Sequence, residues 1–311
     1  MSTAIAVSDA GSTAPVPDYG SGPRPEWLGT DWSRHLRWLE IDGRPVNLLD
    51  MGSGPPLVFV HGHSACWAHW LEQIPVFART NRVVALDLPG FGHSPLPADE
   101  LSISGYARTI DQVCEALGID AACLVGNSMG GFVAAELAIN FPQRVERLVL
   151  VAAAGVSDRY IGLPAELMRH PGVVAASRVL FALGGVPDRL ARAIAARPRG
   201  RRFALGWVCT HPEQLHSALV YEIERGAGRP GAALASLAIA TYDFRDRVSE
   251  IACPTLIVWG DRDYLISHRS AHEYERLIEH TEMHVYPDTG HVPMIERPAR
   301  FNADLRSFLA A

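Results

Sequence analysis

Short apolar runs recur along the chain, each followed by a turn and then by apolar positions at helical spacing. Four such runs cover residues 57–62, 82–90, 121–128 and 147–155, and helical patterns cover 103–119 and 129–141. Near-continuous Val and Leu runs are typical of strands that are buried on both faces of a parallel sheet. Since strands that alternate with helices indicate right-handed βαβ crossovers, the pattern predicts an α/β fold.

The alternation begins with a hairpin and is interrupted once. Residues 37–41 and 46–51 flank a Gly-containing turn and predict two paired strands. From about residue 155 to about residue 245 only helical patterns follow, and strand-like runs return at 255–261 and 283–290. We interpret the helical block as an insertion that covers one edge of the sheet.

These patterns divide the chain into three parts. Residues 1–30 are rich in Gly, Pro, Ser and Ala and have no helical or strand period, which predicts a flexible tail. Residues 31–155 and 246–311 are expected to form the α/β core, and residues 156–245 a helical cap.

Composition and charge exclude several classes of function. The formal charge of −6 argues against a general nucleic-acid binder, and no apolar run approaches the roughly 20 residues of a membrane span. All 28 basic residues are arginine, which removes Schiff-base chemistry and a Ser-Lys dyad. The five cysteines form no CxxC pair and indicate neither a disulfide framework nor a zinc site. Since the first residues lack the features of a secretory signal, we expect a cytoplasmic protein. A metal site needs three or four convergent ligands, and because the sequence shows no such set beyond His61 and His63, we expect neither a metal nor a cofactor.

A candidate nucleophile follows the third of the apolar runs. Residues 126–130 read Gly-Asn-Ser-Met-Gly and match G-x-S-x-G between a predicted strand and a predicted helix. Gly126 and Gly130 keep side chains out of the tight crossing, and Ser128 is held in a strained conformation with its hydroxyl exposed. The helix that follows directs its first N–H groups to the place where negative charge develops.

The nucleophile needs a base, and the base needs an orienting acid. His291 lies in the loop between the last predicted strand and the last predicted helix, which is where the base is expected. Asp261 and Asp263 both follow the preceding strand, and the residues themselves favour Asp263 only slightly. The loop around His63, after the first run, can offer its backbone N–H to an oxyanion together with that of Met129.

The chain resembles the α/β-hydrolase superfamily from about residue 37 to its end. The resemblance rests on VFVHG, DLPGFGHS, GNSMGG, WGDRD and GHVPMIERP in this order. It implies a mostly parallel eight-stranded sheet flanked by helices, with an inserted helical cap. In the family, the last residue of G-x-x-D carries the catalytic acid, which here is Asp263. The branch includes small carboxylesterases and hydrolases of meta-cleavage products, which cut a C–C bond.

Two departures separate the chain from the C–C hydrolases. Those enzymes carry an HGxGPG loop and a tryptophan after the catalytic histidine, where this chain has HGHSAC and Val292. We therefore expect a serine hydrolase that cleaves small carboxylic esters through an acyl-enzyme. The alternatives are a C–C hydrolase, a lactone or amide hydrolase, and a ligand-binding receptor of the same fold. The expected partner is a small ester or acyl substrate, with no nucleic acid and no membrane span, and a homodimer is one option for the oligomeric state.

Overall fold

The computed structural model describes most of the chain. It covers residues 18–22, 24–97, 101–156, 185–227 and 231–311, with residues 159–160, 163–164, 170, 172–173 and 176 between them. None of the helices in these ranges is long and apolar enough to cross a membrane.

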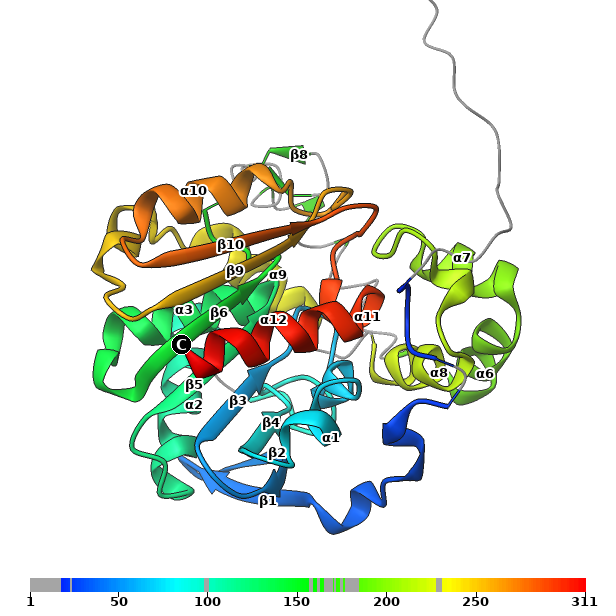
Figure 1. Cartoon of the computed structure of the whole chain (residues 1–311), viewed down its shortest axis with the longest axis horizontal. Coiled ribbons are helices and arrows are strands. Elements are labelled where there is room, and N and C mark those ends of the chain that lie inside the picture. Colours follow the sequence, from blue (N-terminus) through cyan, green and yellow to red (C-terminus); the bar gives the residue numbers. More distant parts are fainter. Residues whose placement is uncertain are drawn as a thin grey trace, which may run out of the picture.

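An eight-stranded sheet runs through the described core (Figure 1). Its strands are β1 (Leu36–Ile41), β2 (Arg44–Gly52), β3 (Pro56–Val60), β4 (Arg82–Leu86), β5 (Ala122–Asn127), β6 (Val145–Val151), β9 (Thr255–Gly260) and β10 (Thr281–Tyr286). Their spatial order is β1-β2-β4-β3-β5-β6-β9-β10. Strand β2 is antiparallel to both its neighbours, and every other pair in this sheet is parallel. The predicted α/β fold and its opening hairpin are confirmed.

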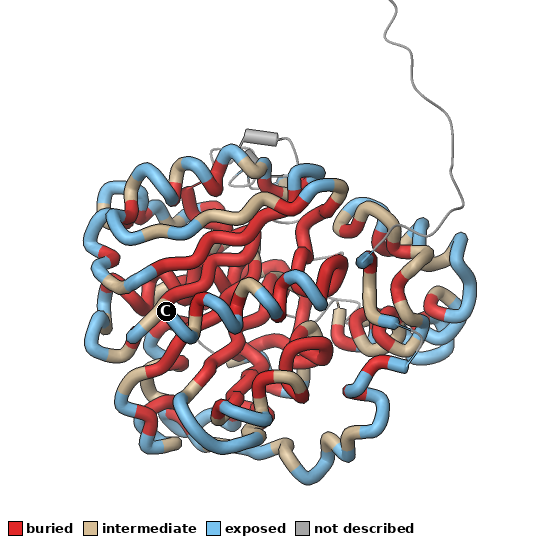
Figure 2. The backbone as a smooth tube through the Cα atoms, viewed as in Figure 1, coloured by how far each residue is buried: buried red, intermediate tan, exposed pale blue. Residues whose placement is uncertain are grey.

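Helices cover both faces of the sheet. They are α1 (Ile74–Phe77), α2 (Ile103–Ala116), α3 (Met129–Asn140), α10 (Arg269–Leu277), α11 (Pro293–Glu296) and α12 (Pro298–Ala310). Side chains of α2, α3 and α10 join one apolar core, and those of α1, α11 and α12 join a second core on the opposite face. Because the central strands alternate between the two cores, they are apolar at nearly every position and red throughout in Figure 2.

Two helices show how sequence determines their place. Ser102 is the N-cap residue of α2. Its Oγ accepts a hydrogen bond at 3.0 Å from Gly105 N, which has no carbonyl acceptor within the helix. Helix α3 is mostly apolar, and all its residues except Asn140 are buried, including Glu136. A helix of this kind is stable only inside a core. The chain therefore enters the core directly after Ser128, at Met129.

The inserted cap lies between β6 and β9. Its described helices are α6 (Asp188–Ala196), α7 (Pro198–Leu205), α8 (Ser217–Gly226) and α9 (Gly231–Thr241). Helices α6, α7 and α8 group beside the sheet in Figure 1, whereas α9 lies close to it. A two-residue antiparallel pair, β7 (Arg159–Tyr160) and β8 (Leu163–Pro164), also falls in this region, where the sequence pattern indicated no strand.

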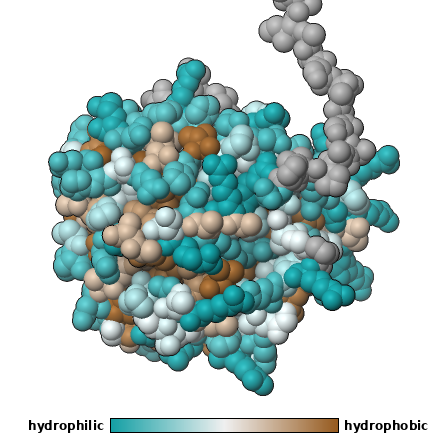
Figure 3. All heavy atoms as spheres, in the orientation of Figure 1, coloured by the Kyte–Doolittle hydropathy of each residue, from teal (hydrophilic) through white to brown (hydrophobic). Residues whose placement is uncertain are grey.

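The stretch that we expected to be a flexible tail contains packed positions. Tyr19 and Trp27 are 8% and 4% exposed, and Trp27 is the buried residue of the short helix η1 (Glu26–Gly29). Residues 1–17 lie outside the described part of the chain. On the face shown in Figure 3 the surface is mainly hydrophilic, with small separate apolar patches.

Candidate active site

Ser128 occupies a sharp turn between β5 and α3. Its φ of 55° and ψ of −118° are rare for a residue with a side chain and indicate a strained backbone. Both backbone polar groups of Ser128 are hydrogen-bonded. Ser128 N donates to Val151 O at 2.9 Å, and Ser128 O accepts from Ala154 N at 3.0 Å. Ser128 is partly exposed although residues on either side are buried, so its side chain is accessible at the surface.

The two glycines of the motif are required by close contacts. A Cβ on Gly126 would lie 2.2 Å from the carbonyl oxygen of Gly130, and one on Gly130 would lie 2.3 Å from Val60 O. Neither distance is compatible with a side chain, and both obstacles are backbone atoms. The reason given above for these two glycines is confirmed.

His291 and Asp263 form a buried pair. The distance between His291 Nδ1 and Asp263 Oδ2 is 2.7 Å, and the two side chains are 7% and 0% exposed. The other carboxylate oxygen of Asp263 accepts hydrogen bonds from Leu265 N and Ile266 N, both at 2.9 Å. The carboxylate is therefore fixed by backbone donors on one side and faces the imidazole on the other, which leaves Nε2 as the nitrogen that points away from the acid.

Asp261 lies in a different environment. It is exposed, and its Oδ1 accepts a hydrogen bond from Thr289 N at 3.3 Å. No contact among the described residues joins its carboxylate to His291.

Asn127 links the serine turn to the histidine loop. Its side-chain amide donates to Val151 O at 3.1 Å and to His291 O at 3.3 Å. Among the contacts of the described residues, none joins Ser128 Oγ to His291 itself. Catalytic hydrogen bonds are often long before substrate binds, so a triad does not require this contact in the unliganded protein. Sequence reasoning gave Asn127 no role, although it stands inside the motif.

The loop after β3 lies directly against the serine turn. A Cβ on Gly62 would be 3.1 Å from Ser128 Cβ, so residues 61–64 border the place where a substrate carbonyl would meet the serine. The backbone N–H groups of His63 and Met129 remain our candidates for an oxyanion site. Met129 is the first residue of α3, and the first N–H groups of a helix have no acceptor within the helix.

Both histidines of this loop are engaged in other contacts. In His61, Nε2 accepts from Leu88 N at 3.0 Å and Nδ1 donates to Gly62 O at 2.7 Å. In His63, Nε2 lies 2.7 Å from Ala232 O in the cap. Burial lowers the pKa of both rings, which keeps them neutral. Nowhere in the described part of the chain do three or more His, Cys, Asp or Glu side chains gather as metal ligands would.

The cysteines offer no competing nucleophile. All five are free thiols, and burial raises the pKa of each. A thiol with a raised pKa holds little thiolate near neutral pH and reacts slowly.

A strand–serine–helix turn beside a buried His-Asp pair, on a mostly parallel sheet with a helical insertion, defines an α/β hydrolase. The sequence pattern of the family described as "alpha/beta hydrolase fold" matches residues 55–298, and the chain belongs to this family.

Individual proteins similar to this chain are named for different substrates. The chain is 33% identical over 286 residues to the 2-hydroxy-6-oxo-2,4-heptadienoate hydrolase of Pseudomonas putida, an alignment that covers 88% of this chain and 96% of that protein. It is 33% identical over 279 residues to the 2-hydroxymuconate semialdehyde hydrolase of a Pseudomonas species, covering 86% and 91% of the two proteins. A solved esterase from Exiguobacterium antarcticum has a TM-score of 0.73 at 23% identity, over 88% of this chain and 99% of that one, which shows likeness of fold.

Proposed function

We propose that the protein hydrolyses small carboxylic esters, with Ser128 as nucleophile, His291 as general base and Asp263 as the acid that orients it. The observation that carries this proposal is the buried contact between His291 Nδ1 and Asp263 Oδ2, beside a strained serine at the end of β5. A carboxylate at Nδ1 fixes the tautomer in which Nε2 is free to take a proton, as nucleophilic catalysis by serine requires.

The reaction would proceed in two balanced steps. In the first, Ser128 Oγ bonds to the ester carbon while its proton moves to His291 Nε2, and that proton then leaves on the departing alcohol as the C–O bond breaks. In the second, a water molecule attacks the acyl carbon and gives its proton to the same nitrogen. That proton passes to Ser128 Oγ as the bond between the acyl carbon and Oγ breaks, which releases the acid and the free serine. The N–H groups of His63 and Met129 are proposed to stabilise the oxyanion in both steps, an effect on the order of 3 kcal/mol per donor in a serine protease of another fold.

A second candidate is hydrolysis of a 2-hydroxy-6-oxo-dienoate, and the names of the two Pseudomonas relatives favour it. Breaking a carbon–carbon bond demands a further polar group that protonates the substrate before the serine attacks. The residue after the proposed base is Val292, which is apolar and 4% exposed, and His63 is already bonded to the cap. These surroundings support the ester as the first candidate.

One purified sample decides between the two candidates. We expect turnover of short-chain p-nitrophenyl esters, and little turnover of a 2-hydroxy-6-oxo-dienoate. A kcat/KM for the dienoate that exceeds that for the best ester by about tenfold, or about 1.4 kcal/mol of transition-state preference, would show that the second candidate is correct. Ser128→Ala is the control, because it should abolish either reaction. Any turnover that remains in this variant comes from a contaminant and can be subtracted.

A further inference from the structure

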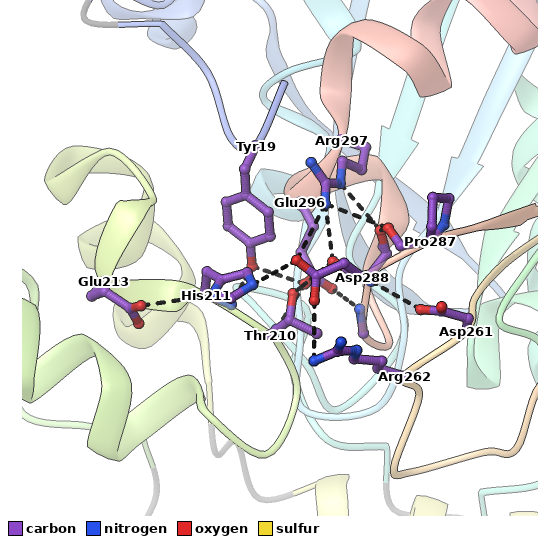
Figure 4. A network of polar contacts seen from close by, with 12 residues as sticks. Tyr19, Thr210, His211, Glu213, Asp261, Arg262, Pro287, Asp288, Glu296 and Arg297 are labelled. Carbon is purple, nitrogen blue, oxygen red and sulfur yellow. Dashed lines mark hydrogen bonds and ion pairs between the residues drawn. The ribbon is translucent and has the colours of Figure 1, made fainter. Parts of the chain in front are cut away.

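Three distant parts of the chain meet on one buried carboxylate beside His291. Glu296, at the end of α11, is fully buried. It accepts hydrogen bonds from the hydroxyl of Tyr19 at 2.8 Å, from Thr210 N and Oγ1 at 2.8 and 2.9 Å, and from Gly290 N at 2.9 Å (Figure 4). These donors belong in turn to the N-terminal segment (residues 18–22), to the cap, and to the loop that carries His291.

The cap also touches the histidine loop directly. His291 N donates to Val208 O, a cap carbonyl, at 2.8 Å. A Cβ on Gly290 would lie 2.4 Å from that same oxygen and 2.9 Å from Glu296 Oε1. The backbone of the proposed base is therefore held between a cap carbonyl and the Glu296 carboxylate, with no space for a side chain at position 290.

Tyr19 closes the link between the cap and this loop. Its hydroxyl donates to Glu296 and accepts from His211 N at 2.9 Å, and its ring meets that of His211 edge-on at 5.3 Å. The Arg297 guanidinium lies 5.1 Å from the Tyr19 ring centre. Burial raises the pKa of Tyr19, so the hydroxyl keeps the proton that it donates. In Figure 4 the tyrosine stands between the cap residues and the end of α11.

Further contacts hold the same region without Tyr19. His211 Nε2 lies 2.7 Å from Asp288 Oδ2, and Arg262 Nη1 lies 3.2 Å from the other oxygen of this carboxylate. Arg297 donates to Asp288 O at 3.0 Å. Because these contacts remain when one hydroxyl is removed, a variant at Tyr19 should fold and should differ in how firmly the histidine loop is held.

We propose that Tyr19 is a positioning residue, through which the N-terminal segment fixes the cap and the His291 loop in the arrangement that catalysis needs. The inference rests on the proposed function of Ser128 and His291. Tyr19 would act only through Glu296 and His211. It lies outside residues 55–298, the range that the family pattern matches.

The test is Tyr19→Phe, which keeps the ring and removes the hydroxyl. We expect kcat for a p-nitrophenyl ester to fall about tenfold, since small displacements of a catalytic group cost one to two orders of magnitude. KM should change by less than about twofold, because the hydroxyl lies among protein groups and not at the serine. An unchanged kcat in a folded Tyr19→Phe protein would overturn the proposal.

Two control variants separate positioning from general stability. Tyr106→Phe makes the same chemical change at a tyrosine that is 2% exposed and donates to Pro89 O at 3.2 Å. Trp27→Phe removes a buried hydrogen bond of similar kind, from Trp27 Nε1 to Glu72 Oε1 at 2.7 Å, near the same end of the chain. Both should lower the melting temperature as Tyr19→Phe does and leave kcat unchanged. A fall in kcat of equal size in all three variants would contradict a positioning role.

A fluorophosphonate probe keeps this test separate from that of the proposed function. The probe reacts with an activated serine whatever the natural substrate is. If the native protein is not labelled at Ser128, the proposed function fails. If the native protein is labelled and Tyr19→Phe reacts at the same rate, the function stands and the role of Tyr19 is refuted.

A double-mutant cycle with Thr210→Val checks the shared carboxylate. The Tyr19 hydroxyl donates to Glu296 Oε2, and Thr210 Oγ1 lies 2.9 Å from the same oxygen and 3.0 Å from Asp288 O, so the effects of the two substitutions on kcat should be coupled. We expect the double variant to differ from the product of the two single effects by at least about threefold. Strictly multiplicative effects would contradict action through Glu296.

Discussion

Exchanging the Asp263 carboxylate for an amide tests the orientation of the base. In Asp263→Asn, the oxygen can still accept from Leu265 N and Ile266 N, so the loop after β9 should keep its shape. The new amide NH₂ then faces His291 Nδ1 at the place where a carboxylate oxygen now lies 2.7 Å away. Since an NH₂ group only donates, it selects the tautomer with the proton on Nε2, and that nitrogen can no longer accept the proton of Ser128.

The expected loss of kcat is large because the side chains of Asp263 and His291 are buried away from solvent. Water cannot substitute for a carboxylate whose side chain is 0% exposed beside an imidazole that is 7% exposed. The same exchange in a related triad lowers kcat by about 10⁴, which corresponds to about 5.4 kcal/mol. Steady-state hydrolysis of a p-nitrophenyl ester measures it, with circular dichroism to verify folding.

Asp261→Asn provides the matched control, since it makes the same change two residues away. Asp261 is exposed, and its oxygen can still accept from Thr289 N after the exchange. We expect kcat within about threefold of the native value, because among the described residues the Asp261 carboxylate contacts Thr289 N and not His291. Equal losses from Asp261→Asn and Asp263→Asn in folded proteins would refute the reasoning.

The remaining predictions concern the nucleophile, the turn and a buried histidine. In the proposed triad Ser128 and His291 act as a unit, so the double alanine variant should lose little more kcat than either single one, and a loss equal to the product of both would contradict this. Gly130→Ala should lower the free energy of unfolding by about 3 kcal/mol, since its Cβ would meet Val60 O at 2.3 Å, and native stability in urea would contradict it. Burial, together with a smaller repulsion from the His61 ring, lowers the pKa of His69 to about 3. Neither ring nitrogen of His69 has a hydrogen-bond partner among the described residues. The contribution of the neutral ring to the free energy of unfolding is therefore complete above about pH 6.5 and is lost as the pH falls toward 3. In His69→Leu, the free energy of unfolding should fall less steeply with decreasing pH, by about 1.4 kcal/mol per pH unit. An unchanged slope between pH 6 and 4 would show that His69 does not titrate in this way.

Much of the fold was predictable because its signals are local. The apolar runs around residues 57–62 and 121–128 became β3 and β5, because a strand that is covered on both faces buries nearly every position. The serine turn was readable because two glycines within five residues mark a crossing too close for side chains. The choice between Asp261 and Asp263 was open on the residues themselves, because both follow the same strand. Which carboxylate approaches His291 depends on a contact 28 residues away.

The parts that sequence reasoning missed depend on contacts between distant segments. Tyr19 lies in a stretch without periodicity, and its partner Glu296 is 277 positions further along. Nothing in the composition around Tyr19 indicates burial, because its packing is provided by the cap and α11. Glu296 stands in the quoted segment GHVPMIERP, yet its contacts appear only when donors from three separate segments converge on it. The short pair β7 and β8 was missed because two-residue strands carry too few positions for a period.

Mass spectrometry of a trapped acyl-enzyme tests the central claim most directly. The protein is mixed with a p-nitrophenyl ester, quenched in acid within the first turnovers, and digested. We predict that the acyl group is found on Ser128, in an amount that matches the initial release of nitrophenolate, and that Ser128→Ala shows neither adduct nor release. An acyl group on another residue, or full ester turnover by Ser128→Ala, would contradict the account.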